Sequence, residues 1–137
     1  MLANGTLLGY RVPGTEDYTD LPNLKTVPDI DNEKEKVENT PITAGNKRYE
    51  YGVGDYGDME YTFVYEGNKE NTTYRMLREY ADSNTILEFE EMWTDGTKFS
   101  YAAIPSIGFK RGGGTNTVID LSVKMALQSD IIVTDPT

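Results

Sequence analysis

Apolar and polar residues alternate with a period of two in the clearest segments of the chain. In the cleanest example, 119–127, every second residue is Ile, Leu, Val or Met, and Asp, Ser, Lys and Ala lie between them. Strict alternation is typical of a strand with one buried face. The same pattern, in shorter form, occurs at 61–65, and residues 86–93 and 99–104 predict the two strands of a hairpin. These segments predict a mainly β protein.

The N-terminal part of the chain is richer in turn residues. Short apolar segments at 7–12 and 24–27 predict strands that end at the prolines that follow, and 35–40 predicts an acidic strand. Residues 41–58 contain five glycines and prolines and three tyrosines, and they predict a long loop. Long loops in small domains are usually functional or disordered, and tyrosines supply contact area at low entropic cost. We therefore expect this loop and an N-terminal arm, about 1–20, to contact neighbouring subunits.

One helix is predicted, over about 70–82, because apolar residues recur there at helical spacing. Its apolar face consists of Tyr74, Leu77, Tyr80 and Ala81. Asn68 or Asn71 is expected to cap its first turn. Two ion pairs at i,i+4 spacing are expected, Arg75 with Glu79 and Arg78 with Asp82.

The chain continues with a hairpin turn at Asp95-Gly96, a strand that ends at Pro105 and a flexible loop at 110–114. The sum is one domain, 1–137, with an antiparallel system of six to eight strands. The predicted fold is a β-sandwich or barrel with one flanking helix.

Composition narrows the function. The chain has no His and no Cys, so the commonest general bases, nucleophiles and transition-metal ligands are missing. Its 23 acidic and 13 basic residues give a net charge of −10. That balance disfavours ordinary duplex DNA binding and docking on anionic membranes. No secretory signal or membrane-spanning segment is predicted.

Three motifs resemble chemical sites, and each fails. Glu88 and Glu90 are about 7 Å apart on one strand face, a spacing found in inverting glycosidases, but two acids on one strand rarely flank a sugar from opposite sides. Residues 29–33 resemble the start of a calcium loop, yet Lys34 occupies the position of the required glycine. Gly112–Gly114 lacks the ending of a phosphate loop. We therefore predict a protein that is not an enzyme, without cofactor or metal.

The order of the segments resembles a known family. The relevant stretches are 24–29, the acidic strand 35–40, 57–65, the hairpin 94–97, 104–108 and the long strand 117–127. Together they resemble the major tail protein, or tail tube protein, of long-tailed bacteriophages, including the tube-forming domain of phage lambda's major tail protein. The resemblance spans roughly residues 7–130. The additional immunoglobulin-like domain of the lambda protein has no counterpart here, so a minimal tube subunit is expected.

The resemblance implies a structural virion protein, assembled in the bacterial host cytoplasm into the virion tail. Hexameric rings would stack into a tail tube whose inner wall is a continuous barrel. Its partners would be other copies of itself, the tape-measure protein and tail-end proteins, with no membrane involved. DNA would pass through the lumen during ejection without specific binding.

Two sets of residues follow as candidates. Acids on strands, opposite the apolar face, would line the lumen and repel DNA. These candidates are Glu35, Glu38, Glu60, Glu88, Glu90 and Asp120. The candidate contacts between subunits lie in the long loop and are Lys47, Arg48, Tyr49, Tyr51 and Tyr56.

Two other functions stay open from the sequence. One is a tube protein of a contractile tail-like or secretion system, which would share the stacked rings. The other is a β-sandwich binding module that does not assemble, with exposed aromatic residues such as Trp93 as its ligand platform.

Overall fold

A computed structural model of the chain describes residues 4–31, 33–38, 45, 49–57, 59–114 and 117–136. These residues form ten strands and one helix, α1 (Thr73–Asp82). The strands are β1 (Leu7–Arg11), β2 (Thr19–Asp20), β3 (Leu24–Thr26), β4 (Glu33–Glu38), β5 (Tyr49–Asp55), β6 (Met59–Val64), β7 (Leu87–Met92), β8 (Lys98–Lys110), β9 (Asp120–Leu127) and β10 (Ile132–Thr134).

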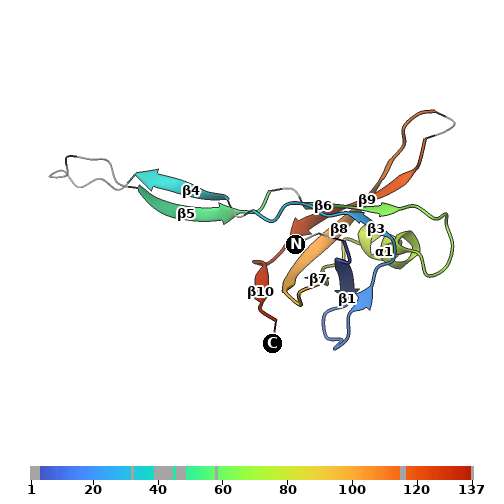
Figure 1. Cartoon of the computed structure of the whole chain (residues 1–137), viewed down its shortest axis with the longest axis horizontal. Coiled ribbons are helices and arrows are strands. Elements are labelled where there is room, and N and C mark those ends of the chain that lie inside the picture. Colours follow the sequence, from blue (N-terminus) through green and yellow to red (C-terminus); the bar gives the residue numbers. More distant parts are fainter. Residues whose placement is uncertain are drawn as a thin grey trace.

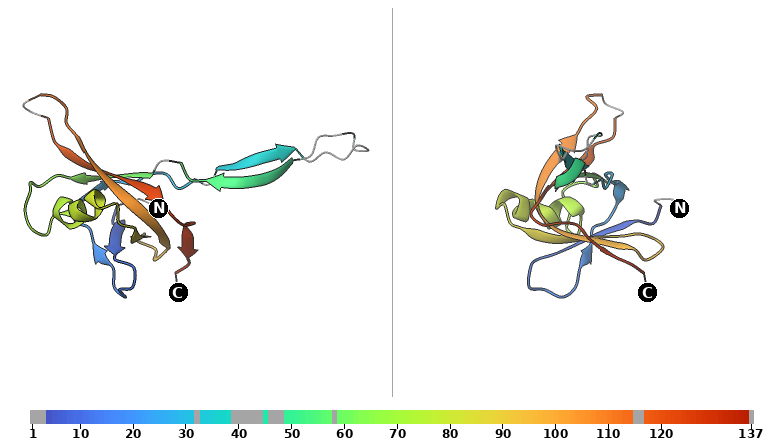
Figure 2. Two further views of the ribbon diagram at one scale, coloured as in Figure 1. Left: turned by 180° about the vertical axis from the view of Figure 1, so that it is seen from behind. Right: turned by 90° about the vertical axis from the view of Figure 1, so that its left-hand side faces the viewer.

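Eight strands form one antiparallel sheet, and two form a separate hairpin. The order in the larger sheet is β2-β1-β7-β8-β9-β6-β3, with β10 also paired to β8. The hairpin β4–β5 stands off the body on one side, while α1 and the loop that joins β8 to β9 lie on the opposite side (Figure 1). The view from behind shows the same separation (Figure 2).

The longest strand, β8, joins the two halves of the sheet. Its residues 98–103 pair with β7, and its residues 103–110 pair with β9. The sequence predicted that this strand ends at Pro105, and that prediction is wrong. Pro105 pairs with Met125 on β9 and has no partner on the β7 side. At this point β8 is locally an edge strand, which is where a residue without an N–H is tolerated.

The core lies between the two halves of the folded sheet and α1. The alternation predicted at 119–127 is confirmed for Leu121, Val123 and Met125, which are buried, and for Lys124 and Ala126, which are exposed. It is wrong at Ile119, which is 42% exposed, and at Ser122, which is buried. The largest side chains that are almost fully buried include Tyr61, Phe63, Phe89, Leu8 and Met59. The helix contributes Leu77, which is fully buried.

The helix is confirmed, but its beginning and its surface contacts differ from expectation. Neither expected asparagine caps it. Asn71 has a φ of 63°, in the left-handed region, and the cap is Thr72, whose Oγ1 accepts a hydrogen bond from Arg75 N. An N-cap residue normally has an extended backbone, as Thr72 does.

The two expected ion pairs along the helix are not formed. Among the residues that the structure describes, the ion pairs are Arg11–Glu88, Lys25–Asp120 and Lys110–Glu60. Both guanidinium groups of the helix, on Arg75 and Arg78, are therefore outside any ion pair in the described ranges. Exposed pairs at this spacing gain only a few tenths of a kcal/mol, so their absence costs the fold little.

The predicted loop at 41–58 is partly a strand. Residues 49–55 form β5 and pair with β4, with an irregularity in register between Lys34 and Lys36. Gly52 and Gly54 hid this strand, because glycine is depleted in strands and interrupts the alternation. The short strands β2 and β10 were also missed. The turn at Asp95-Gly96 is confirmed, with Asp95 Oδ1 accepting a hydrogen bond from Thr97 N.

Within the described residues, no helix has the length and apolar character needed to cross a membrane.

Candidate assembly surfaces

The projecting hairpin carries two of the five residues predicted to contact other subunits. Tyr49 and Tyr51 lie on β5, where they pair in register with Glu38 and Lys36 of β4. Tyr56 follows the hairpin, and its half-buried ring packs against the core of its own subunit. The other two candidates, Lys47 and Arg48, lie outside the described residues. The structure therefore brings Tyr49 and Tyr51 together and sets Tyr56 apart.

The six candidate lumen acids divide into three groups. Glu35 and Glu38 lie on β4 in the hairpin, Glu60 and Asp120 lie on the neighbouring strands β6 and β9, and Glu88 and Glu90 lie on β7. Two strands, β8 and β9, separate β6 from β7 in the sheet.

Glu60 lies on the outer face of β6 and is held by two donors. Its Oε1 accepts a hydrogen bond from Ser122 Oγ at 2.7 Å and lies 2.7 Å from Lys110 Nζ. The hydrogen bonds from Lys110 and then Ser122 lower the pKa of Glu60 below its ordinary value. Glu60 therefore stays ionised at neutral pH, but Lys110 compensates its charge.

Asp120 begins β9 and is also paired. Its Oδ2 lies 2.9 Å from Lys25 Nζ, which comes from β3. Its Oδ1 is buried and has no hydrogen-bond partner among the described residues. The Lys25–Asp120 pair connects strands that are two positions apart in the sheet order.

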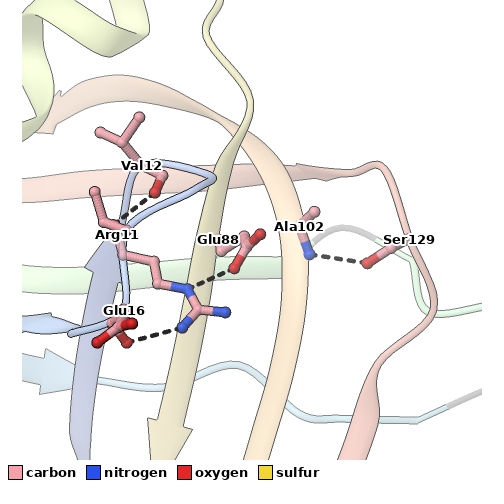
Figure 3. Close-up of polar contacts among 7 residues, drawn as sticks. Arg11, Val12, Glu16, Glu88, Ala102 and Ser129 are labelled. Carbon is pink, nitrogen blue, oxygen red and sulfur yellow. Dashed lines mark hydrogen bonds and ion pairs between the residues drawn. The ribbon is translucent and has the colours of Figure 1, made fainter.

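Glu88 forms the third pair, at the wall of a small cavity. Arg11 Nε donates a hydrogen bond to Glu88, and Arg11 Nη1 donates to the backbone oxygen of Glu16 at 3.0 Å (Figure 3). The guanidinium lies 4.4 Å from the centre of the Tyr18 ring. The hydrogen bond to Glu88 raises the pKa of Arg11. Glu90, two residues along β7, takes part in none of the three ion pairs.

The cavity beside this pair has a volume of about 330 Å³ and is lined in part by Arg11, Tyr18, Ser100 and Ile132. Its opposite wall is closed by Ser129, whose Oγ accepts a hydrogen bond from Ala102 N (Figure 3). Among the described residues that line it, the one cation is Arg11, which is already paired with Glu88. The cavity therefore offers no uncompensated charge for an ionic ligand.

A buried carboxylate was missed by sequence reasoning. Glu91 on β7 is 1% exposed, and its two oxygens accept hydrogen bonds from Tyr61 Oη at 2.8 Å and Trp93 Nε1 at 2.7 Å. Tyr101 Oη in turn donates to Tyr61 Oη. Burial raises the pKa of Tyr61 and Tyr101. The sequence could have indicated this burial, because Glu91 lies two and four residues after Phe89 and Leu87, which face the core on the same side of β7.

Within the described ranges, no group of three or more acidic, His or Cys side chains is arranged to hold a metal ion. Glu33, the last residue of the acidic stretch 29–33, is the first residue of β4.

No family model and no curated protein matches the chain. Solved structures do match it along its whole length, at low sequence identity.

The matching chains come from phage-like tail particles. A chain of the native gene transfer agent virion is 16% identical, with a TM-score of 0.70 and 98% of both chains covered. A chain of the tail of the empty gene transfer agent particle, refined with helical C6 symmetry, is 17% identical, with a TM-score of 0.68 and 93% and 94% coverage. A chain of the sheath/tube terminator of an extracellular contractile injection system is 12% identical, with a TM-score of 0.67 and 98% and 96% coverage.

The protein is therefore similar in fold to structural components of phage-like tails. The predicted fold class, mainly antiparallel β with one helix and tail tube-like, is confirmed.

Proposed function

We propose that copies of this chain assemble into rings that stack to form the tube of a phage-like tail. The observation that carries this proposal is the hairpin β4–β5, which forms its own two-stranded sheet and projects from the body (Figure 1). A two-stranded hairpin is marginally stable by itself in water. A surface on another copy would give it the third partner that it needs.

The full-length likeness to chains of tail particles supports the same proposal. One of these particles was refined with six-fold helical symmetry, which suggests hexameric rings for this chain as well. Rings require head-to-tail contacts that close, and stacking requires a second contact that repeats along the axis. The hairpin projects from one side of the molecule, which suits the stacking contact between rings.

The tube would serve as a conduit, with DNA passing through the bore during ejection and a tape-measure protein filling it during assembly. The three ion pairs change the expected character of its wall. Glu60, Glu88 and Asp120 would each present a compensated charge, whichever of their faces borders the bore. Such a surface neither attracts a polyanion strongly nor repels it as strongly as bare acids would.

The test is to follow assembly directly. Size-exclusion chromatography over a wide range of concentrations, followed by negative-stain microscopy, should show rings or hollow rods with six-fold end views. A compact monomer at every concentration would overturn the proposal and favour a binding module that does not assemble.

The tube of a contractile system is a second candidate, because a contractile injection system supplies one of the structural matches. It shares the ring and the stack. Co-assembly with a sheath protein around the finished tube would distinguish it from a tube that carries no sheath.

A further inference from the structure

Three aromatic rings, two of them half-buried and one exposed, cluster at the end of β8 and the start of α1. Tyr65 follows β6, Tyr74 lies on α1 and Phe109 lies near the end of β8. Their ring centres lie 5.3 to 5.9 Å apart in all three pairings. Phe109 is 45% exposed, so this cluster is only partly covered by its own subunit. We call these three residues the aromatic patch.

Two arginines border the aromatic patch, and neither forms an ion pair with a described residue. The Arg78 guanidinium lies 5.7 Å from the centre of the Tyr74 ring, and Arg75 Nη1 donates to Asn68 Oδ1 at 3.4 Å. Both arginines are exposed. The acids nearest in sequence, Glu79 and Asp82, lie on the same helix without pairing to them. Partly exposed rings next to uncompensated guanidinium groups suit a ligand that brings aromatic rings and carboxylates together.

The hairpin has that composition. Its strands β4 and β5 contain five acids and two lysines, a net charge of −3, and residues 39–48 between them contain Lys47 and Arg48. Strand β5 also contains Tyr49 and Tyr51. β5 has seven residues, so the hairpin extends about 23 Å at ~3.3 Å per residue, enough to reach across to a neighbour.

We propose that the hairpin of one copy docks on the aromatic patch of the next. The hairpin and the helix α1, which carries Tyr74 of the patch, lie on opposite sides of the molecule in Figure 1 and in the left view of Figure 2, so a hairpin faces away from the patch of its own subunit. A contact between different surfaces on two copies is heterologous, and its repetition builds a polymer. This inference rests on the proposed tube and assigns the contact that joins its subunits.

Engineered cysteines provide a clean test, because the natural chain contains none. We would prepare Phe109→Cys and an affinity-tagged Tyr51→Cys separately, mix them under assembly conditions and add a short bismaleimide. The expected result is a cross-linked dimer of the two variants, at least several-fold above the yield from either variant alone. Ile119→Cys, at another exposed position of the β8–β9 hairpin, repeats the test if Phe109→Cys folds poorly.

Val133→Cys is the matched control. Val133 on β10 is also exposed, at 53%, but it pairs with Phe99 at the opposite end of β8 from Phe109. Mixed with Tyr51→Cys, it should give only background cross-linking. Equal yields at positions 109 and 133 would overturn the specific contact.

The two proposals fail in different ways. Rings or rods in micrographs, with no cross-link from Tyr51→Cys to either Phe109→Cys or Ile119→Cys, would overturn the docking contact and leave the tube intact. An absence of rings and rods at every concentration would overturn both. In the docked assembly, Arg75→Glu with Arg78→Glu should reduce rod yield at least tenfold, and Lys98→Glu, a cation on the other end of β8, should not.

Discussion

The hydroxyl oxygen of Tyr61 on β6 lies 2.8 Å from Glu91 Oε1 on β7, although β8 and β9 separate these strands in the sheet. In a flat sheet, three steps of about 4.8 Å would keep the two backbones roughly 14 Å apart along the sheet. The contact is possible because the sheet folds over its own core. This hydrogen bond therefore joins the two halves of the fold through the interior.

Tyr61→Phe should destabilise the folded chain by about 1–3 kcal/mol. The substitution removes a donor from a buried carboxylate and an acceptor from Tyr101 Oη, and a buried polar group without its partner costs about that much. Tyr101→Phe removes only the outer donor and should cost less, about 0.5–1.5 kcal/mol. Urea unfolding of the unassembled chain measures both. If Tyr61→Phe and Tyr101→Phe reduce the free energy of unfolding equally, the hydrogen bond from Tyr61 to Glu91 does not contribute the extra stability expected of it.

Stability should fall as pH rises above about 10. Burial raises the folded-state pKa of Tyr61 and Tyr101 above the ordinary value of 10.0. The unfolded chain therefore ionises these phenols first, so their contribution is complete below pH 10 and is lost progressively above it. The measurement is the free energy of unfolding at about pH 9 and about pH 11.

The double variant Tyr61→Phe/Tyr101→Phe is the control for this titration. It lacks both phenols and should lose less stability over the same pH interval than the natural chain does. An identical slope in both proteins would assign the alkaline loss to other groups, such as Tyr10 and Tyr18, whose pKa values burial also raises.

Sequence reasoning succeeded where a residue's environment depends on its immediate neighbours. The alternation predicted β9 correctly because its apolar residues Leu121, Val123 and Met125 all face the core. Sequence reasoning failed where the conformation of a segment depends on a partner strand that is distant in sequence. Pro105 is accommodated only because β7 pairing ends at Ala103, and β5 forms only because β4 pairs with it.

The candidate site shows the same division. That Glu60, Glu88 and Asp120 lie on strands could be predicted from their own segments. Their cations could not, because Lys110, Arg11 and Lys25 come from other strands that only the tertiary fold brings near. Glu91 was detectable, since its position in the alternation is that of an apolar residue, but it resembled the two acids that precede it on the strand, Glu88 and Glu90.

Thr72→Ala should cost about 1 kcal/mol, the usual loss for a helix N-cap. Thr72 Oγ1 accepts from Arg75 N at the first turn of α1. Asn68→Ala is the matched control, because Asn68 touches the helix only through an exposed 3.4 Å contact with the Arg75 side chain, and it should change stability by less than about 0.5 kcal/mol. The urea unfolding midpoints of the two variants measure both losses. A larger loss for Asn68→Ala than for Thr72→Ala would support the asparagine cap expected from the sequence.

The lumen wall should draw on one half of the folded sheet and not on both. The outer faces of β7 and of β6 with β9 lie on opposite sides of the shared core, because the strands meet across it through Tyr61 and Glu91. In the proposed tube, one of these faces would border the bore and the other would face outward or toward a neighbour. Glu88→Cys and Glu60→Cys report on the two faces, with no other thiol in the chain.

A maleimide carried on a polymer too wide for the bore should label both variants as monomers and only one of them as tubes. A small maleimide, which can enter the bore, should still label both tubes unless the site lies in a subunit contact. Protection of only one variant from the large reagent identifies the wall strand. Full labelling of both variants by the large reagent in intact tubes would contradict a lumen lined by either set of acids.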